Sequence, residues 1–299
     1  MISQNPRATL FLSLSTICLS FLSPVAFAQV TDYPPPSLIS PREEIRAEFD
    51  SVPCKNGDRL NAVKSLFEKM GAKPEEIVVE KVKGVENVVV RKASATGSKE
   101  KIVIGAHYDK TADGCGAIDN WTGVVALAHV YRTVKDLPLK KNVVFAAFGE
   151  EEKGLVGSSG MAGAIGKEQV AEYCAMINID SLGIGAPQTL DNISSEKLID
   201  FTAALAEKIN APFARSRVDG ASSDSASFIK KKIPAVTIHS LNHDWRRILH
   251  SSNDNPSRIN HDSVYMGYRL VLALLLRVDE ADCRAFREDG MGAGVPRLR

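Results

Sequence analysis

Histidine and carboxylate side chains follow several predicted buried strands of this 299-residue chain. The first such strand end reads His107-Tyr108-Asp109. Residues two apart on a strand point to the same face, so His107 and Asp109 are expected to lie together. A metal-binding imidazole commonly donates its other N–H to a carboxylate, which fixes the ring orientation. Asp109 can therefore orient His107, although so short a pair is also typical of a protein surface.

Two further segments place carboxylates beside glycine-bounded turns. Asp119 lies in the loop 116–123, directly before a predicted helix, where an Asp is commonly the helix N-cap. Its other interpretation is a carboxylate that bridges two metal ions. Glu150, Glu151 and Glu152 directly follow an apolar strand. Glu150 fits a solvated turn, whereas the next two can point in different directions, so that one binds a metal and the other stays free as a base.

The last candidates follow later in the chain. Asp180 comes at the end of the apolar run AMINI, and His250 lies in a loop with Asp254 four residues on. The inventory is then two histidines and three carboxylates as ligands, with one Glu left free. Two tetrahedral metals can be built from it if each takes one His and one carboxylate and both share an Asp and a water. Mixed nitrogen and oxygen ligation without cysteine suits zinc, and cobalt or manganese can substitute.

The elements that must position these residues are short strands alternating with helices. This order predicts an α/β fold: one globular domain whose mostly parallel sheet is covered by helices on both faces. Such sheets bind ligands beyond the carboxyl ends of their strands, where the candidate residues lie. The first two strands alternate in polarity, as in an edge hairpin with one face in water. Strands are expected at 77–82, 85–91, 101–106 and in NVVFAAF, CAMINI and PAVTIHS, and helices at 42–49, 58–70, 122–134, 156–165 and 196–209.

The order of the motifs resembles peptidase family M28, the aminopeptidase-type metallopeptidases with two zinc ions. The resemblance runs from about 101 to 260. It implies a zinc-exopeptidase-like fold, two zinc ions per chain and peptide substrates with a free N-terminus. It rests on GAHYDK, GAIDNWTG, FGEEEKGLVGS, NIDSLG, SDSASFIKKKIPAV and ILHSSNDNPSRIN.

The resemblance also implies a role for each residue by its position in these motifs. Zinc lowers the pKa of bound water, and a general base takes the proton as the water attacks the scissile carbonyl. A free N-terminus near the carboxylates favours removal of N-terminal residues over internal cleavage. The implied roles are His107 and Asp180 on one zinc, Glu152 and His250 on the other, Asp119 as the bridge, Glu151 as the general base and Asp109 as the partner of His107.

Two positions depart from the family pattern. Ser225 stands where the family often has the His of a Ser-Asp-His motif, so the role of that His is missing. Trp121 follows Asp119-Asn120, where the family usually has a small residue. The indole ring is expected to narrow the substrate pocket, so the specificity of relatives does not transfer.

Other functions remain open beside the peptidase. Glutaminyl cyclases have a similar fold with a single zinc, and share the His-Tyr-Asp strand end and the Glu-Glu pair; the GLVGS run and the Asp119-Asn120 pair favour the peptidase. A carboxypeptidase or another amidohydrolase on the same scaffold is also possible. A non-catalytic binding protein is disfavoured because Glu151 and all the ligands are present. A serine hydrolase is disfavoured because no Gly-x-Ser-x-Gly elbow occurs.

The four remaining histidines have structural interpretations. His129 lies within a predicted helix, and His261 is expected at the surface. His239 and His243 lie near the predicted cleft, where either can touch substrate, but a hydrogen-bonded structural role is favoured.

The first 28 residues predict a secretory signal peptide. Arg7 precedes an apolar run at 10–22, and Ala26-Phe27-Ala28 matches the small-x-small cleavage pattern. An uncleaved anchor is the alternative, but the run is short and serine-rich for a membrane span. The peptidase domain would then be 29–299, with a flexible tail from about 288, exported to the periplasm or the medium.

The remaining composition bounds the partners of the exported domain. Removing 1–28 takes away one charged residue and leaves 36 basic and 36 acidic side chains, so nothing indicates a nucleic-acid-binding surface. No second apolar stretch reaches spanning length, so no membrane contact is expected after cleavage. The oligomeric state is left open. Export favours one or two disulfides among four cysteines with three full pairings: Cys54, Cys115, Cys174 and Cys283.

Overall fold

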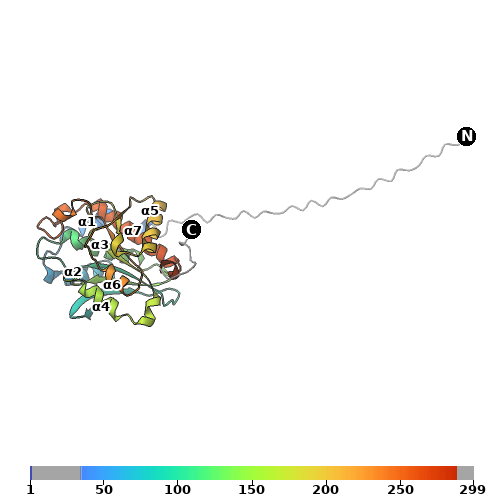
Figure 1. The fold of residues 1–299 in the computed structure, drawn as a ribbon, viewed down its shortest axis with the longest axis horizontal. Helices are drawn as coiled ribbons and strands as arrows, with labels where there is room; N and C mark the ends of the chain where they lie inside the picture. Colours follow the sequence, from blue (N-terminus) through green and yellow to red (C-terminus); the bar gives the residue numbers. More distant parts are fainter. Residues whose placement is uncertain (2–33, 35, 288–299) are drawn as a thin grey trace.

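The computed structural model describes residues 36–287 together with Met1 and Pro34. Apart from Met1, the predicted signal peptide (1–28) and the tail from 288 lie outside the described residues. One mixed eight-stranded sheet, ordered β1-β2-β4-β3-β5-β8-β6-β7, runs through the molecule with helices on both faces (Figure 1). The predicted α/β architecture is confirmed.

The central strands are parallel to one another, and each flank joins them through one antiparallel pair, β2 with β4 and β6 with β8. β3 pairs in parallel with β4 and β5, and β5 pairs in parallel with β8, so the carboxyl ends of these four strands lie at one edge. β2 is antiparallel to both β1 and β4. The strands are β1 (Ile77–Val82), β2 (Val85–Lys92), β3 (Lys101–His107), β4 (Asn142–Phe148), β5 (Tyr173–Ile179), β6 (Gln188–Leu190), β7 (Ala214–Ser216) and β8 (Ala235–His239).

The predicted edge hairpin is half right. β1 is the edge strand; its first residue is buried, the next two are exposed, and exposed and half-buried residues alternate only from Val79 on. β2 lies between β1 and β4 and is buried over Asn87–Val90, because helices pack against both of its faces. β6 and β7 are three residues each and carry no sequence pattern that would have revealed them.

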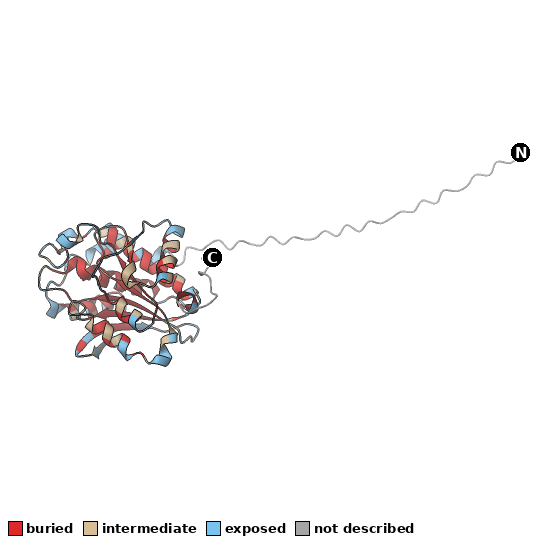
Figure 2. Ribbon diagram, viewed as in Figure 1, coloured by how far each residue is buried: buried red, intermediate tan, exposed pale blue. Residues whose placement is uncertain are grey.

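The helices divide between two cores that the sheet separates. The larger core contains Val63, Leu127 and Leu275, and the smaller one contains Ala162 and Phe228. Figure 2 shows the buried residues concentrated along the strands and the inward helix faces. The helices are α1 (Arg42–Ala47), α2 (Asn56–Lys69), α3 (Thr122–Val134), α4 (Val156–Ala164), α5 (Glu196–Lys208), α6 (Ser225–Lys230) and α7 (His261–Glu280).

α7, the longest helix of the described residues, was not predicted from the sequence. It packs against α3 and buries one apolar face. Gly267 lets it approach the chain after β5, because a Cβ there would lie 2.7 Å from side-chain atoms of Leu182. His261, expected at the surface, is the first helical residue and is half-buried, with its ring beside Phe49. α7 therefore supports the segment that follows Asp180.

The remaining features concern the start of the chain and its cysteines. Pro36–Leu38 form a 3₁₀ turn. Cys54 pairs with Cys115 and Cys174 pairs with Cys283, one of the three possible full pairings. In the part of the chain that the structure describes, no helix is long and apolar enough to cross a bilayer.

The N-cap of α7 gives a test of this packing. The Asn260 side chain accepts a hydrogen bond from the Ser263 N–H at 3.1 Å. Asn260→Ala should lower the free energy of unfolding by about 1 kcal/mol, because one N–H of the first turn loses its acceptor. Asn260→Asp, which keeps the acceptor, is the control in urea unfolding. Equal stability of the two variants would contradict the role of the cap.

Candidate metal centre

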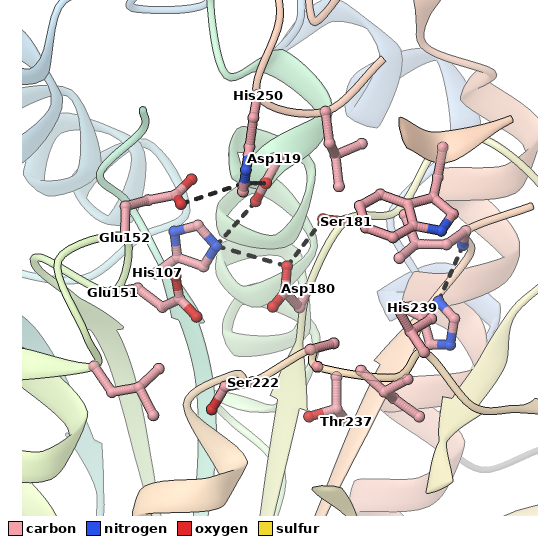
Figure 3. A pocket seen from close by; sticks show the side chains of 18 of the residues that line it. His107, Asp119, Glu151, Glu152, Asp180, Ser181, Ser222, Thr237, His239 and His250 are labelled. Atoms are coloured by element: carbon pink, nitrogen blue, oxygen red, sulfur yellow. Dashed lines mark hydrogen bonds and ion pairs between the residues drawn. The ribbon is translucent and has the colours of Figure 1, made fainter. Parts of the chain in front are cut away.

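Three neighbouring parallel strands deliver side chains to one place. β3 ends at His107, the turn after β4 carries Glu151 and Glu152, and β5 is followed by Asp180. His250 comes from a loop before α7. Figure 3 shows these side chains converging with Asp119 around one pocket. The predicted strand-end arrangement is therefore observed.

Asp119 lies between the two histidines. Its Oδ1 is 3.1 Å from Nε2 of His107, and its Oδ2 is 3.0 Å from Nε2 of His250. Each histidine also faces a carboxylate of its own: Asp180 Oδ1 is 3.6 Å from His107 Nε2, and Glu152 Oε2 is 3.3 Å from His250 Nε2. The five predicted ligands thus form two sets that share one carboxylate.

The donor atoms fit zinc. In each of the two sets, one potential ligand atom per residue lies within 4.8 Å of the others. The sets combine one imidazole nitrogen with carboxylate oxygens, a mixture that zinc accepts. Oε1 of Glu152 is buried without a hydrogen-bond partner among the described residues. A buried acceptor of this kind is costly unless something satisfies it, and a cation would.

The alternative interpretation of Asp119 as a helix N-cap is wrong. No hydrogen bond from its side chain caps α3. The cap-like bond comes from the next residue, because Asn120 Oδ1 accepts from the Gly123 N–H at 3.0 Å. Asp254 holds the turn from the other side by accepting the N–H groups of Ile118 and Asp119 at 2.7 and 3.1 Å. These bonds leave the Asp119 carboxylate free to face both histidines.

Asp109 lies beside His107 but mainly organises the glutamate turn. Its Oδ1 and Oδ2 accept from the N–H groups of Glu151 and Glu152 at 2.9 and 3.2 Å. Its carboxylate is 3.6 Å from Nδ1 of His107, and its backbone oxygen is closer, at 3.2 Å. Asp109 therefore contacts His107 through both groups and fixes the position of the predicted base and ligand.

Burial of so many acids changes their pKa values. Burial raises the pKa of Glu151 to about 10, with His107 opposing and Asp224 and Asp180 adding to the rise. Burial and Asp119 raise the pKa of Glu152 to about 7. In the low dielectric of the site, carboxylates this close hold protons unless a cation balances them.

The neighbouring carboxylates also change the pKa values of the two histidines. The hydrogen bond that the protonated His250 ring donates to Asp119 raises the pKa of His250 to about 9. Burial opposes a charge on His107, but Glu151 and hydrogen bonds to three aspartates raise its pKa well above the ordinary value. Clusters of strongly perturbed groups in a cleft are typical of functional sites.

The ligands line a cavity of about 580 Å³. Glu151 lies beside His107 at its floor (Figure 3). Trp121 was expected to narrow this pocket, and that is wrong: it is buried against the Arg59 guanidinium and is not among the lining residues. The apolar wall comes instead from Leu155, Leu190, Val218, Leu241, Trp245 and Leu249.

Of the other histidines, His129 and His239 have the structural roles that were expected, and His243 does not. His129 is buried, with Nδ1 2.8 Å from the Ser40 hydroxyl. His239 lines the cavity, but both ring nitrogens are engaged, one with the Ser216 hydroxyl and one with the Leu241 N–H. His243 is exposed beside Asp244. Ser225, at the position of the missing family His, is buried and donates to the Ile193 carbonyl.

Two charged residues with no exposed surface, Arg59 and Asp224, were not predicted from the sequence. Arg59 is fully buried in α2 and donates to carbonyls of the site loops. Asp224 is fully buried behind the glutamate turn, and its two oxygens have no hydrogen-bond partner within the described ranges. One signal could have revealed Arg59: it lies four residues before Val63, on the apolar stripe of its helix.

Comparison with known proteins gives one family. The family model described as "Peptidase family M28" matches residues 87–275. The aminopeptidase YwaD of Bacillus subtilis is 28% identical over 151 residues, which are 48% of this chain and 33% of the relative. The match therefore spans about a third of that relative's length.

Solved structures share the fold. BSAP, a zinc aminopeptidase from Bacillus subtilis, matches with a TM-score of 0.59 at 23% identity, over 68% of this chain and 53% of that one. A glutaminyl cyclase from Fimbriiglobus ruber matches with a TM-score of 0.63 at 16% identity, over 79% and 93%. At these identities the likeness concerns the fold alone.

The raised pKa values predict that the metal-free protein loses stability as the pH rises. Glu151 and His250, with pKa values of about 10 and 9, hold protons in the folded state that the unfolded chain has released. Such groups stabilise the fold fully below the unfolded pKa and lose that contribution as the pH rises through the folded pKa. The melting temperature in chelator should therefore fall between about pH 7 and pH 9.

Zinc should reduce this fall, because His250 binds zinc without its proton and a nearby cation favours the ionised form of Glu151. The zinc-loaded protein, melted across the same pH range, is the control. A melting temperature of the metal-free protein that stays level or rises over this range would contradict the conclusion that Glu151 and His250 hold protons in the folded state.

Proposed function

The chain belongs to peptidase family M28, and from that membership we propose that it is a zinc aminopeptidase that removes N-terminal residues from peptides. The position of Asp119 carries the proposal. One carboxylate faces two histidines, each of which has a further carboxylate of its own, while Glu151 stays outside both pairs. This is the donor arrangement that two metal ions sharing one ligand require.

We assign His107 and Asp180 to one zinc, Glu152 and His250 to the other, and Asp119 to both. When bound, zinc supplies a Lewis acid that lowers the pKa of water and polarises a carbonyl oxygen. The hydroxyl groups of Ser181 and Ser223 donate to Oδ1 and Oδ2 of Asp180 at 3.0 and 2.5 Å, and so hold that carboxylate in place.

Glu151 is the proposed general base. Its carboxylate lines the cavity, and its backbone N–H is fixed by Asp109. Its ionised form, favoured once cations balance the neighbouring carboxylates, accepts a proton from the attacking water. It then passes that proton to the leaving amine of the scissile bond.

The surrounding acids support the preference for a free N-terminus. A peptide α-ammonium entering the cavity meets the carboxylates of Glu151, Glu152 and Asp180, all on the cavity wall. Coulomb attraction at short range in a partly buried site favours this charged end over an uncharged internal peptide bond.

We further propose that the protein is exported. Residues 1–28 would be a signal peptide, and 29–299 the peptidase domain. The two disulfides support this assignment, because disulfides persist mainly in oxidising compartments.

A Glu151 variant tests the general base. Glu151→Gln should keep zinc binding and lower kcat about 10²-fold or more, because the amide cannot accept the proton. Glu150→Gln is the matched control, since Glu150 is the preceding residue, pairs with Lys153 and does not line the cavity. Near-normal kcat in Glu151→Gln would show that another group is the base.

Metal removal separates the peptidase from a glutaminyl cyclase, which the extensive match to the cyclase structure keeps open. We expect near two zinc ions per chain by elemental analysis, and release of free amino acids from aminoacyl anilides that stops on chelation and returns with zinc. One zinc per chain, with cyclisation of N-terminal glutaminyl peptides and no anilide hydrolysis, would favour the cyclase instead.

A further inference from the structure

Arg59 is a fully buried cation at the start of α2, and its hydrogen bonds end on backbone carbonyls. Nη1 donates to Tyr108 O at 2.8 Å and to Asp109 O at 3.3 Å. Nη2 donates to Cys115 O and Gly116 O, both at 2.7 Å. Burial lowers the pKa of its guanidinium to about 10, so the group stays charged at neutral pH.

These carbonyls belong to the two segments that carry ligands from both metal sets. Tyr108 and Asp109 directly follow His107. Cys115 and Gly116 lie in the loop of residues 110–119, hereafter the bridging loop, which ends at Asp119. Arg59 therefore joins the end of β3 to this loop through hydrogen bonds to backbone carbonyls of both segments.

The fit between Arg59 and the bridging loop is close. A Cβ at Gly116 would lie 2.9 Å from Nη2 of Arg59 and 2.8 Å from the Asp119 carbonyl oxygen. Gly116 also has a φ of +60°, which L side chains rarely adopt. From the opposite side, the Asp254 carbonyl accepts the Cys115 N–H at 2.7 Å. The loop is thus held between α2 and the segment after His250.

A disulfide ties the same two parts together. Cys54, just before α2, pairs with Cys115 in the bridging loop. Asn56 adds a reciprocal pair of hydrogen bonds: its side chain donates to the Lys110 carbonyl at 2.8 Å and accepts the Lys110 N–H at 2.9 Å. Cys54 is exposed and Cys115 is buried, so solvent reaches this disulfide from one side.

We propose that Arg59 is a positioning residue for the metal centre and that the Cys54–Cys115 disulfide keeps the bridging loop on it, so that zinc affinity depends on this disulfide. The inference rests on the proposed function, in which Asp119 binds zinc. Opening the disulfide leaves α2 and the loop joined only by hydrogen bonds. Asp119 and the end of β3 then lose their fixed separation.

The chain contains a matched construction far from the metal centre. Cys174 pairs with Cys283, and Arg287 donates to the carbonyls of Val170 and Tyr173 at 2.8 and 2.7 Å. Cys174 lies at the amino end of β5, six residues before Asp180, which is about 20 Å along a strand. We call each such pair of an arginine and a disulfide a clamp: Arg59 with Cys54–Cys115 is the first, and Arg287 with Cys174–Cys283 is the second. The second clamp stabilises the fold without contacting the ligands.

The test compares the two clamps in the full chain by competition with a fluorescent zinc chelator. Cys54→Ser/Cys115→Ser and Arg59→Lys should each weaken zinc binding at least about tenfold, as loss of residues that orient ligands commonly does. Cys174→Ser/Cys283→Ser and Arg287→Lys should change zinc affinity less than about threefold, even where they lower the melting temperature. Equal losses from both clamps, or no loss from the first, would overturn the inference.

Reduction of the unsubstituted chain gives a second measurement if a variant fails to fold. A water-soluble phosphine reduces the disulfide by two electrons: it takes the oxygen of one water as phosphine oxide, and the two hydrogens of that water appear on the thiols of Cys54 and Cys115. Mass spectrometry after thiol alkylation of an aliquot identifies the opened disulfide. After removal of the phosphine, chain with only this disulfide open should bind zinc at least about tenfold more weakly than oxidised chain.

Unchanged affinity after that selective reduction would overturn the inference and leave the proposed function intact. Absence of zinc binding by the oxidised, unsubstituted chain would contradict the proposed function itself, and the inference with it. Re-oxidation should restore the affinity, which separates a positioning effect from irreversible unfolding.

Discussion

The clustering of buried carboxylates around two histidines is the constraint on which the rest of the structure depends. Asp119 touches both imidazoles, and Glu151 is driven by burial to hold a proton. Such an arrangement opposes folding unless a cation balances it or protons neutralise it. In the proposed function, bound zinc would balance these charges, and the perturbed groups would be the ones that the chemistry needs.

The surrounding chain meets this constraint with backbone dipoles and the buried guanidinium of Arg59. The N–H groups of the glutamate turn point at Asp109, and those before Asn120 point at Asp254. Arg59 forms no ion pair with the site carboxylates, because its hydrogen bonds go to backbone carbonyls. Its positive charge nevertheless interacts with Asp254, Asp119 and Asp109 through space. The parallel strands set the positions of the ligands, and these polar contacts set their directions.

Sequence alone could predict the central strands and the placement of His107 and Asp180, because each of these two residues directly follows a continuous apolar run. The structure brings the two together as expected. Asp119 and His250 lie in loops, and the family resemblance was needed to assign them. What depends on tertiary contacts was missed. The Trp121 ring lies against Arg59 and outside the cavity lining. The cysteine pairing depends on which loops meet in the fold. β6 and β7 are too short to show the alternation of polarity that predicts a strand. The residue roles at the site stay predictions.

Anomalous diffraction at the zinc edge from crystals of the zinc-loaded protein tests the central claim most directly. The account predicts two peaks on opposite sides of the Asp119 carboxylate, one beside His107 and Asp180 and one beside Glu152 and His250. A single peak bound by only one set, or zinc bound away from Asp119, would contradict the shared-carboxylate centre.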